Sequence, residues 1–207
     1  MIELVAFLGN YGPEYANTRH NAAWLFEESL PWASRLNWSD KYKSKFSSAD
    51  YEQFVTWLPE GISVPSSYPK KLYFMKPLTY MNLSGEAIGE ASRFFKIPPE
   101  NVLIVHDEIE LPIGTVSLKW SGGLGGHNGL RSAKSVLGTA DFWRLRFGVG
   151  KPKDGNVAEY VLGSFSPDER IILSQVFAQA AVLFGKVLTS RDPQRLVPEW
   201  GKKKCMA

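Results

Sequence analysis

The chain has 207 residues, of which 44% are hydrophobic and 22% charged; these are ordinary values for a soluble globular protein and they exclude a disordered or fibrous one. Its net charge of +3 is too small to identify a nucleic-acid binder by itself. A single cysteine, Cys205, excludes an internal disulfide framework and favours a cytoplasmic location, and the lack of a long apolar run or a basic leader argues against a membrane span or secretion.

The first third of the chain predicts a strand, a helix and two further strands. Residues 2–8 are an apolar run that ends in a Gly-Asn pair, as a buried strand does. Apolar residues recur at helical spacing over 22–30, and Pro31 ends that helix. Residues 52–58 and 71–75 read as two strands separated by a proline-rich loop.

The middle of the chain predicts a helix, two strands and a glycine-rich loop. Residues 83–96 place their apolar side chains on one face, which indicates a helix with Ser84 as its N-cap. Residues 101–107 form a continuous apolar strand that runs into charge, and 114–120 is a further strand. The glycine-rich segment 121–138 enters a helix that its last glycine ends.

The last part of the chain predicts one strand and one long helix. Residues 143–150 alternate in polarity, as a strand does. Residues 166–188 begin with Ser166, a proline at the first helical position and Glu169, which together form a capping box. Beyond residue 189 we expect less order.

Strands and helices are interspersed without an internal repeat or a linker. We therefore expect a single α/β domain over residues 1–207, with a twisted, mostly parallel mixed sheet flanked by helices on both faces. Ligands bind such sheets beyond the carboxyl ends of the strands. The polar residues that follow the predicted strands or begin helices should then converge, and they are Asn10, His20, Asn82, Asp107 and Asn128.

This set of side chains suits hydrolysis by an activated water. A histidine titrates near neutral pH and can take a proton from water, while a carboxylate on its other ring nitrogen fixes the tautomer. Asparagine amides can hold substrate amides or a developing oxyanion. The residues alone leave other readings open: His20 can simply begin a helix, His106 is its rival as a base, and Asn82 can be a residue that precedes a helix.

Other chemistries have weaker signals. The phosphate-binding pattern G-x-x-x-x-G-K-[ST] and the dinucleotide pattern G-x-G-x-x-G are both absent. A metal site built from His20, His106, Asp107 and His127 is conceivable, but no H-x-x-x-H or H-E-x-x-H spacing supports it. We expect no metal and no cofactor.

Five stretches together resemble one family. They are "FLGNYGPEYANTRHNAA", "KPLTYMNLSGEA", "VHDEIELPIG", "GGLGGHNGLRS" and "FWRLRFGVGKP". In order and spacing they resemble the bacterial peptidyl-tRNA hydrolases, from about residue 3 to residue 165. The chain departs from the family pattern at Tyr11, where proline is usual, at Pro31 within the first helix, and over 34–50.

The resemblance implies a cytoplasmic, monomeric enzyme without a cofactor that cleaves the ester between a peptide and the 3′ ribose of tRNA. It implies that His20 is the base, that Asp107 stabilises its working form, and that Asn10 distinguishes N-blocked peptidyl groups from free aminoacyl groups. Further residues are implied to bind the peptide and the end of the tRNA: Tyr15, Tyr80, Asn82 and Asn128. Basic residues are implied to meet tRNA phosphates: Lys119, Arg146 and Arg131.

Two alternatives to this enzyme remain. One is a non-catalytic RNA-binding relative with the same fold, and the other is a metal-dependent hydrolase. The presence of His20 and Asp107 together with the asparagines favours the enzyme, because a pure binder needs no poised base. The expected partner is peptidyl-tRNA, and no membrane contact is expected.

Overall fold

Eight strands in the described part of the chain form one mixed sheet. They are β1 (Leu4–Phe7), β2 (Ser39–Lys41), β3 (Ser44–Asp50), β4 (Lys71–Pro77), β5 (Val102–Glu108), β6 (Thr115–Trp120), β7 (Trp143–Gly148) and β8 (Lys203–Lys204). In the computed structural model, which describes residues 1–152 and 155–205, their order is β2-β3-β4-β1-β5-β7-β6-β8. The four central strands β4, β1, β5 and β7 are parallel, and the strands at both edges pair antiparallel. The carboxyl ends of the central strands therefore meet at one edge of the sheet.

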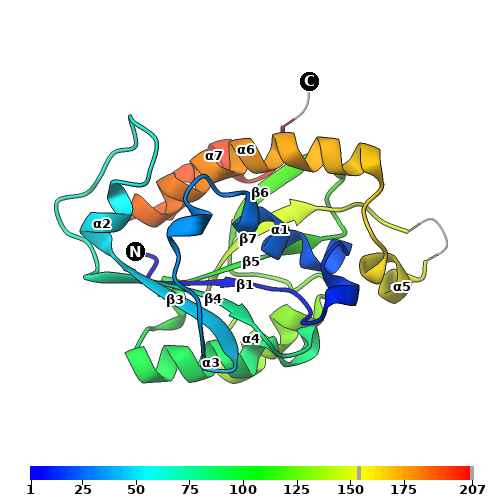
Figure 1. Cartoon of the computed structure of the whole chain (residues 1–207), viewed down its shortest axis with the longest axis horizontal. Helices are drawn as coiled ribbons and strands as arrows, with labels where there is room; N and C mark the ends of the chain where they lie inside the picture. Colours follow the sequence, from blue (N-terminus) through cyan, green and yellow to red (C-terminus); the bar gives the residue numbers. More distant parts are fainter. Residues whose placement is uncertain (153–154, 206–207) are drawn as a thin grey trace.

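Helices cover both faces of the sheet, which confirms the predicted α/β layers (Figure 1). The α-helices are α1 (Ala22–Ser29), α2 (Tyr51–Val55), α3 (Ser84–Phe95), α4 (Asn128–Leu137), α5 (Val157–Leu162), α6 (Pro167–Thr189) and α7 (Val197–Trp200). Short 3₁₀ helices are η1 (Pro13–Tyr15), η2 (Arg19–Asn21), η3 (Ala33–Arg35), η4 (Met81–Leu83), η5 (Pro99–Asn101) and η6 (Pro193–Leu196). Helices α1 and α6 lie on one face of the sheet, and α3 and α4 lie on the other (Figure 1).

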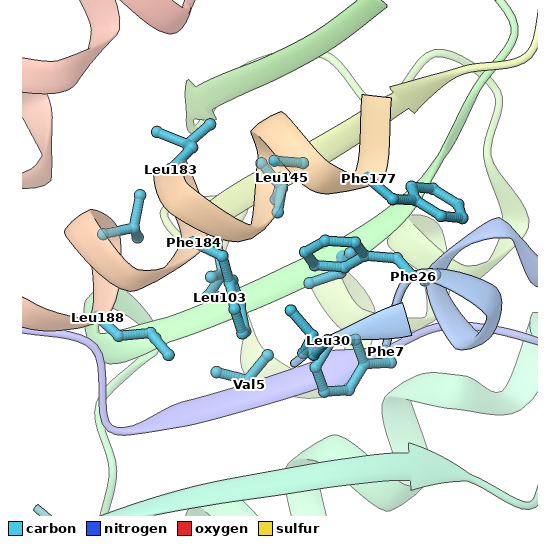
Figure 2. Packing of buried hydrophobic residues seen from close by; sticks show 14 of the residues in the cluster. Val5, Phe7, Phe26, Leu30, Leu103, Leu145, Phe177, Leu183, Phe184 and Leu188 are labelled. Carbon is cyan, nitrogen blue, oxygen red and sulfur yellow. The ribbon is translucent and has the colours of Figure 1, made fainter. Parts of the chain in front are cut away.

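Alternate residues of the central strands supply two apolar layers, because successive side chains of a strand point to opposite faces. On the face of α1 and α6, Phe7 packs with Phe26 and Phe184, whose rings lie 5.5 Å apart edge to face (Figure 2). On the other face Ala6 packs with Ile88 of α3. Burial of each large apolar side chain contributes about 1.5–3 kcal/mol, so these layers fix the sheet that carries the site.

Several local predictions are confirmed. Helix α6 begins with the capping box of Ser166 and Glu169, and helix α4 ends at Gly138, which takes a left-handed φ of 78°. The predicted strand at 52–58 is wrong, because α2 occupies the start of this segment. Tyr51 and Phe54 are both buried at helical spacing, and the neighbouring strand is formed by the preceding residues of β3 instead.

Two further features differ from the sequence reading. Ser84 is not the N-cap of α3: η4 runs directly into the helix, and the Ser84 hydroxyl donates to the Met81 carbonyl at 2.9 Å. Within 34–50 the strands β2 and β3 form a hairpin whose turn residues Tyr42 and Lys43 both have positive φ. Such turns normally carry Asn or Gly, so the local sequence gave no hairpin signal.

The segment beyond residue 189, where the sequence predicts less order, forms η6, α7 and β8. Strand β8 pairs with the outer edge of β6, and Trp200 is buried. Helix α6 is long and apolar enough to cross a membrane, by length and composition only. Half of that apolar window is buried inside the protein, as expected for the core helix of a soluble fold.

Candidate active site

The carboxyl-terminal edge of the parallel strands gathers four polar side chains. Asn10 follows β1, and Asp107 is the penultimate residue of β5. His20 lies in η2, which leads into α1, and His127 directly precedes α4. The site thus combines residues held by both helical layers, and the sheet edge predicted from the sequence is where they meet.

Asp107 accepts hydrogen bonds from two histidines. Nδ1 of His20 lies 2.9 and 3.0 Å from the two carboxylate oxygens, and Nε2 of His127 lies 3.0 Å from Oδ1. Nδ1 of His127 accepts from the backbone N–H groups of Gly129 and Leu130, so it caps α4. This cap requires the proton of a neutral His127 to be on Nε2, where it is donated to Asp107.

The electrostatics of this group favour a charged carboxylate. Burial by itself raises the pKa of Asp107, but the two histidines outweigh burial and hold that pKa well below its ordinary value. Burial lowers the pKa of His20, while the charge and hydrogen bond of Asp107 raise it by more, so the net pKa is above 6.5. Asp107 therefore makes His20 a stronger base and fixes Nδ1 as its protonated nitrogen, leaving Nε2 as the acceptor.

His106, the rival base, lies within the protein. Its side chain is enclosed, with 1% of the residue exposed, and its Nδ1 lies 2.6 Å from the Asp107 carbonyl oxygen. Burial, followed by the nearby His127, lowers its pKa well below the ordinary value. A neutral, enclosed imidazole cannot exchange protons with solvent or substrate, so the geometry favours His20 over His106.

The residues on either side of His20 anchor it. Arg19 donates to both carboxylate oxygens of Glu169 at 3.1 and 2.9 Å and lies 4.3 Å from the centre of the Tyr160 ring. Asn21 is fully buried and pairs with the backbone of Asn10: its Oδ1 accepts from the Asn10 N–H at 2.8 Å and its Nδ2 donates to the Asn10 carbonyl at 3.0 Å. These contacts hold η2 against both α6 and the loop after β1.

The carboxamide of Asn10 is oriented by the backbone. Its Oδ1 accepts from the Met81 N–H at 2.8 Å, which ties the loop after β1 to η4. Among residues 1–152 and 155–205 its Nδ2 has no hydrogen-bond partner, so a donor is the group that Asn10 offers to a ligand.

Two cavities lie at this side of the molecule, and the first of them is lined by both His20 and His127. The first, of about 220 Å³, is lined by His20, Asp107, Glu108, Ile109, Gly125, Gly126, His127, Asn128, Val157, Ala158 and Val161. Its polar floor comes from the strand ends and its apolar wall from α5. The second, of about 420 Å³, lies between η4, α3 and α4 and includes Asn82, Asn128 and Arg131. Asn128 borders both cavities.

The structure brings only part of the predicted set together. Tyr15 is half-buried in η1, and Tyr80, which is 61% exposed, lies at the surface before η4. Lys119 and Arg146 lie on β6 and β7 and belong to neither cavity lining. Arg131 lies on the exposed face of α4.

His20, Asp107 and His127 could also hold a metal ion, because one ligand atom from each lies within 4.8 Å of the others. Both histidines direct a ring nitrogen at the same Asp107 oxygen, and His127 uses the other nitrogen to cap α4. A metal bound here would replace the two hydrogen bonds to Asp107. Without a metal, these hydrogen bonds already satisfy the ligand atoms of all three side chains.

The sequence did not indicate that His127 donates a hydrogen bond to Asp107. The glycine-rich loop was expected to deliver it to the helix start, but its contact with Asp107 depends on the fold. The N-cap position just before α4 was the available local signal, since a cap residue has its side chain at the helix end.

Comparison with known proteins gives a consistent result. A family model described as peptidyl-tRNA hydrolase matches residues 4–205. The peptidyl-tRNA hydrolase of Treponema pallidum is 43% identical over 210 residues, covering 100% of this chain and 98% of that protein. The one of Desulfitobacterium hafniense is 40% identical and covers 84% and 86%. The crystal structure of peptidyl-tRNA hydrolase from Acinetobacter baumannii aligns with a TM-score of 0.77 at 33% identity, covering 96% and 91%.

Proposed function

Because this chain belongs to the peptidyl-tRNA hydrolase family and hydrolyses peptidyl-tRNA, we propose that His20 is the general base that activates the attacking water. The observation that carries this assignment is the contact of 2.9 Å between His20 Nδ1 and the buried carboxylate of Asp107. The paired His20 borders the first cavity, where a water and the ester can meet.

The reaction follows from the protonation states. Nδ1–H of His20 donates to Asp107, so Nε2 accepts a proton from water as the water oxygen attacks the ester carbonyl. The tetrahedral intermediate carries its negative charge on the former carbonyl oxygen, which a neutral amide donor can stabilise. The intermediate collapses by breaking the bond to the 3′ ribose oxygen, and the proton on His20 passes to that oxygen. Asp107 stays ionised and stabilises the imidazolium that forms in between.

Selection of blocked substrates is assigned to Asn10. Its oxygen is engaged by the Met81 N–H, so its Nδ2 donor faces the ligand. A peptidyl group presents an amide carbonyl that accepts this donor, whereas a free aminoacyl group presents an ammonium that has only donors. The Nδ2 donor of Asn10 and the ammonium would face each other without an acceptor. Part of the selectivity therefore comes from rejection of the free aminoacyl group.

The remaining residues are assigned to the substrate. Asn82 and Asn128, which border the second cavity, bind the peptide and the terminal nucleotide region. Tyr15 and Tyr80 are assigned to the same substrate. Lys119 and Arg146 meet tRNA phosphates. We place the enzyme in the cytoplasm as a monomer that needs no membrane. It needs no metal or cofactor, since a histidine–carboxylate pair suffices to activate water.

The decisive test compares N-acetyl-aminoacyl-tRNA with the unblocked aminoacyl-tRNA. We expect release of tRNA from the blocked substrate only, and no release from it would contradict the activity. His20→Ala should lose about 10²–10⁴-fold in turnover while it keeps its affinity for tRNA. Bound tRNA without turnover in the wild-type protein would indicate the non-catalytic binder, and activity lost in EDTA and restored by zinc would indicate the metal-dependent hydrolase.

The phosphate contacts are tested by salt dependence. The double variant Lys119→Ala, Arg146→Ala should bind tRNA more weakly, and its affinity should fall less steeply with salt, because fewer counterions are released. A slope equal to that of the wild type would place the phosphates elsewhere. The exposed Lys202→Ala serves as a control for the loss of a surface charge.

A further inference from the structure

Glu108, the last residue of β5, is a mostly buried carboxylate beside Asp107 that the mechanism does not use. Its Oε2 accepts from Arg146 at 3.3 Å, and its Oε1 accepts from the Glu110 N–H at 3.2 Å. It also borders the first cavity, and a Cβ at Gly125 would lie 3.3 Å from its Oε1. Glu108 therefore touches the glycine-rich loop and a proposed phosphate-binding arginine at once.

The surroundings of Glu108 are rich in positive charge. Lys119 and Arg144 are directly paired across β6 and β7, so with Arg146 they lie on the same sheet face. Arg144 is buried and donates to the carbonyls of the loop residues Gly122 and Gly123 at 2.7 Å each. Burial, followed by Arg146 and Arg144, lowers the pKa of Lys119. One carboxylate thus faces three cations, and the local excess of positive charge suits a further anion.

Arg146 is held by the protein itself. One terminal nitrogen donates to Glu108, and the other donates to the Ser117 hydroxyl at 2.6 Å. Ser117 in turn donates to the carbonyl of Gly201, which links this arginine to the C-terminal segment. The ion pair is largely shielded from water, because the side chains of Arg146 and Glu108 are only 14% and 10% exposed. These contacts engage both terminal nitrogens, so a phosphate that binds the same two nitrogens competes with Glu108 and Ser117 for them.

We propose that Glu108 is an internal competitor for tRNA phosphate: its carboxylate occupies Arg146 in the free enzyme, and the incoming phosphate displaces it. This inference rests on the proposed contact of Arg146 with tRNA. The competition keeps the affinity for deacylated tRNA moderate, so that the product leaves. It also couples phosphate binding to the loop that carries His127 and Asn128, because the carboxylate that is displaced is the one that touches Gly125.

The test measures the dissociation constant of deacylated tRNA for the full chain. Glu108→Gln keeps the shape and the acceptor oxygen but removes the charge, so tRNA should bind about three- to tenfold more tightly, because the phosphate no longer competes with a carboxylate for Arg146. The matched control is Glu110→Gln. It removes the same charge two residues away, where Glu110 pairs with Lys151 at the surface, and should change binding by less than about twofold.

Equal effects of the two substitutions would mean that general electrostatics acts and would overturn the proposal, as would weaker binding by Glu108→Gln. In an Arg146→Ala background, Glu108→Gln should have no more effect than Glu110→Gln; a persistent gain would also overturn it. If Glu108→Gln unfolds, Glu108→Asp keeps the charge but shortens its reach to Arg146, and it should likewise tighten binding. A wild-type protein that binds no tRNA would instead refute the proposed function.

Discussion

Asp107 is the residue on which the chemistry of the site depends, because both neighbouring histidines donate to it. A buried carboxylate without partners would stay protonated and could not strengthen a base. Here the two histidines keep the pKa of Asp107 low, and the resulting charge raises the pKa of His20 above its usual value. Each group of the cluster therefore sets the protonation state that its neighbour needs.

The pH dependence of turnover follows from this coupling. His20 acts as a base only when it is neutral, so kcat/KM should rise with pH through an inflection above the ordinary pKa of a histidine, because Asp107 raises the pKa of His20. Asp107→Asn removes the charge that raises the pKa of His20, so the inflection should move to lower pH. The plateau rate should fall by about 10²–10⁴-fold, because the tautomer of His20 is no longer fixed.

A pH–rate profile of both proteins on N-acetyl-aminoacyl-tRNA measures the two effects separately. The exposed Asp168→Asn, on the first turn of α6, removes a charge away from the site and should leave the inflection in place. An unchanged inflection in Asp107→Asn would refute the coupling between Asp107 and His20.

At the scale of elements, the site depends on how two helices begin. Helix α4 is capped by His127, whose Nδ1 accepts from the first helical N–H groups while its Nε2 donates to Asp107. Helix α6 begins at Ser166, and the capping-box residue Glu169 also accepts from Arg19, the neighbour of His20. The start of α4 thus positions His127, and the start of α6 positions His20 through Arg19. At each start, helix capping and histidine positioning can be separated by substitution.

Substitutions of His127 should separate capping from positioning. His127→Ala loses the cap and should lower the free energy of unfolding by about 0.5–2 kcal/mol. His127→Asn can restore the cap, since asparagine is a strong N-cap residue, but its shorter side chain does not reach Asp107. Urea unfolding should show recovered stability in the asparagine variant, while turnover stays reduced in both. Recovery of turnover with the cap alone would show that the bond to Asp107 is unimportant.

Glu169 offers the corresponding experiment on α6. Ser166→Ala removes the cap only and should lower stability by about 1 kcal/mol with little effect on kcat. Glu169→Gln keeps a capping-box side chain but weakens the ion pair with Arg19 that anchors η2, so turnover should fall several-fold at similar stability. Steady-state kinetics and thermal unfolding of both variants provide the comparison. Equal turnover in the two variants would exclude a positioning role for the ion pair.

At the scale of the whole molecule, the site depends on the core beneath it. Phe184 of α6 is fully buried against α1 and the sheet (Figure 2). Ile171 on the same helix is 61% exposed. The helix that carries Glu169 is therefore attached to the sheet by one apolar face. Loss of the contacts on this face should destabilise the entire fold, since all four central strands contribute side chains to the apolar layer beneath α6.

Phe184→Ala should lower the free energy of unfolding by about 3–5 kcal/mol, through lost burial and the cavity that remains. Ile171→Ala, the control on the exposed side, should change it by less than about 0.5 kcal/mol. Denaturant titrations followed by fluorescence measure both. A small effect of Phe184→Ala would show that the cavity collapses and that α6 is not anchored through this ring.

The sequence by itself determined what local physics controls. The apolar runs of the central strands, the helical spacing of α3 and the capping box of α6 are properties of neighbouring residues, and the structure has all of them. The sequence also marked His20 and Asp107 as candidates, because polar residues at strand ends are visible without a fold, and the resemblance to a family linked them. The contact between them, across 87 positions, needed the fold.

Only the tertiary structure decided which segments meet. Residues 51–55 form a helix rather than a strand because Tyr51 and Phe54 are then buried in the core on one helical face. The edge strand β8 exists because β6, more than 80 residues earlier in the chain, supplies its hydrogen-bond partners. The contact of His127 with Asp107 and that of Glu108 with Arg146 join segments 20 and 38 positions apart. Such contacts carry no local pattern, because their energy arises only when separate elements pack together.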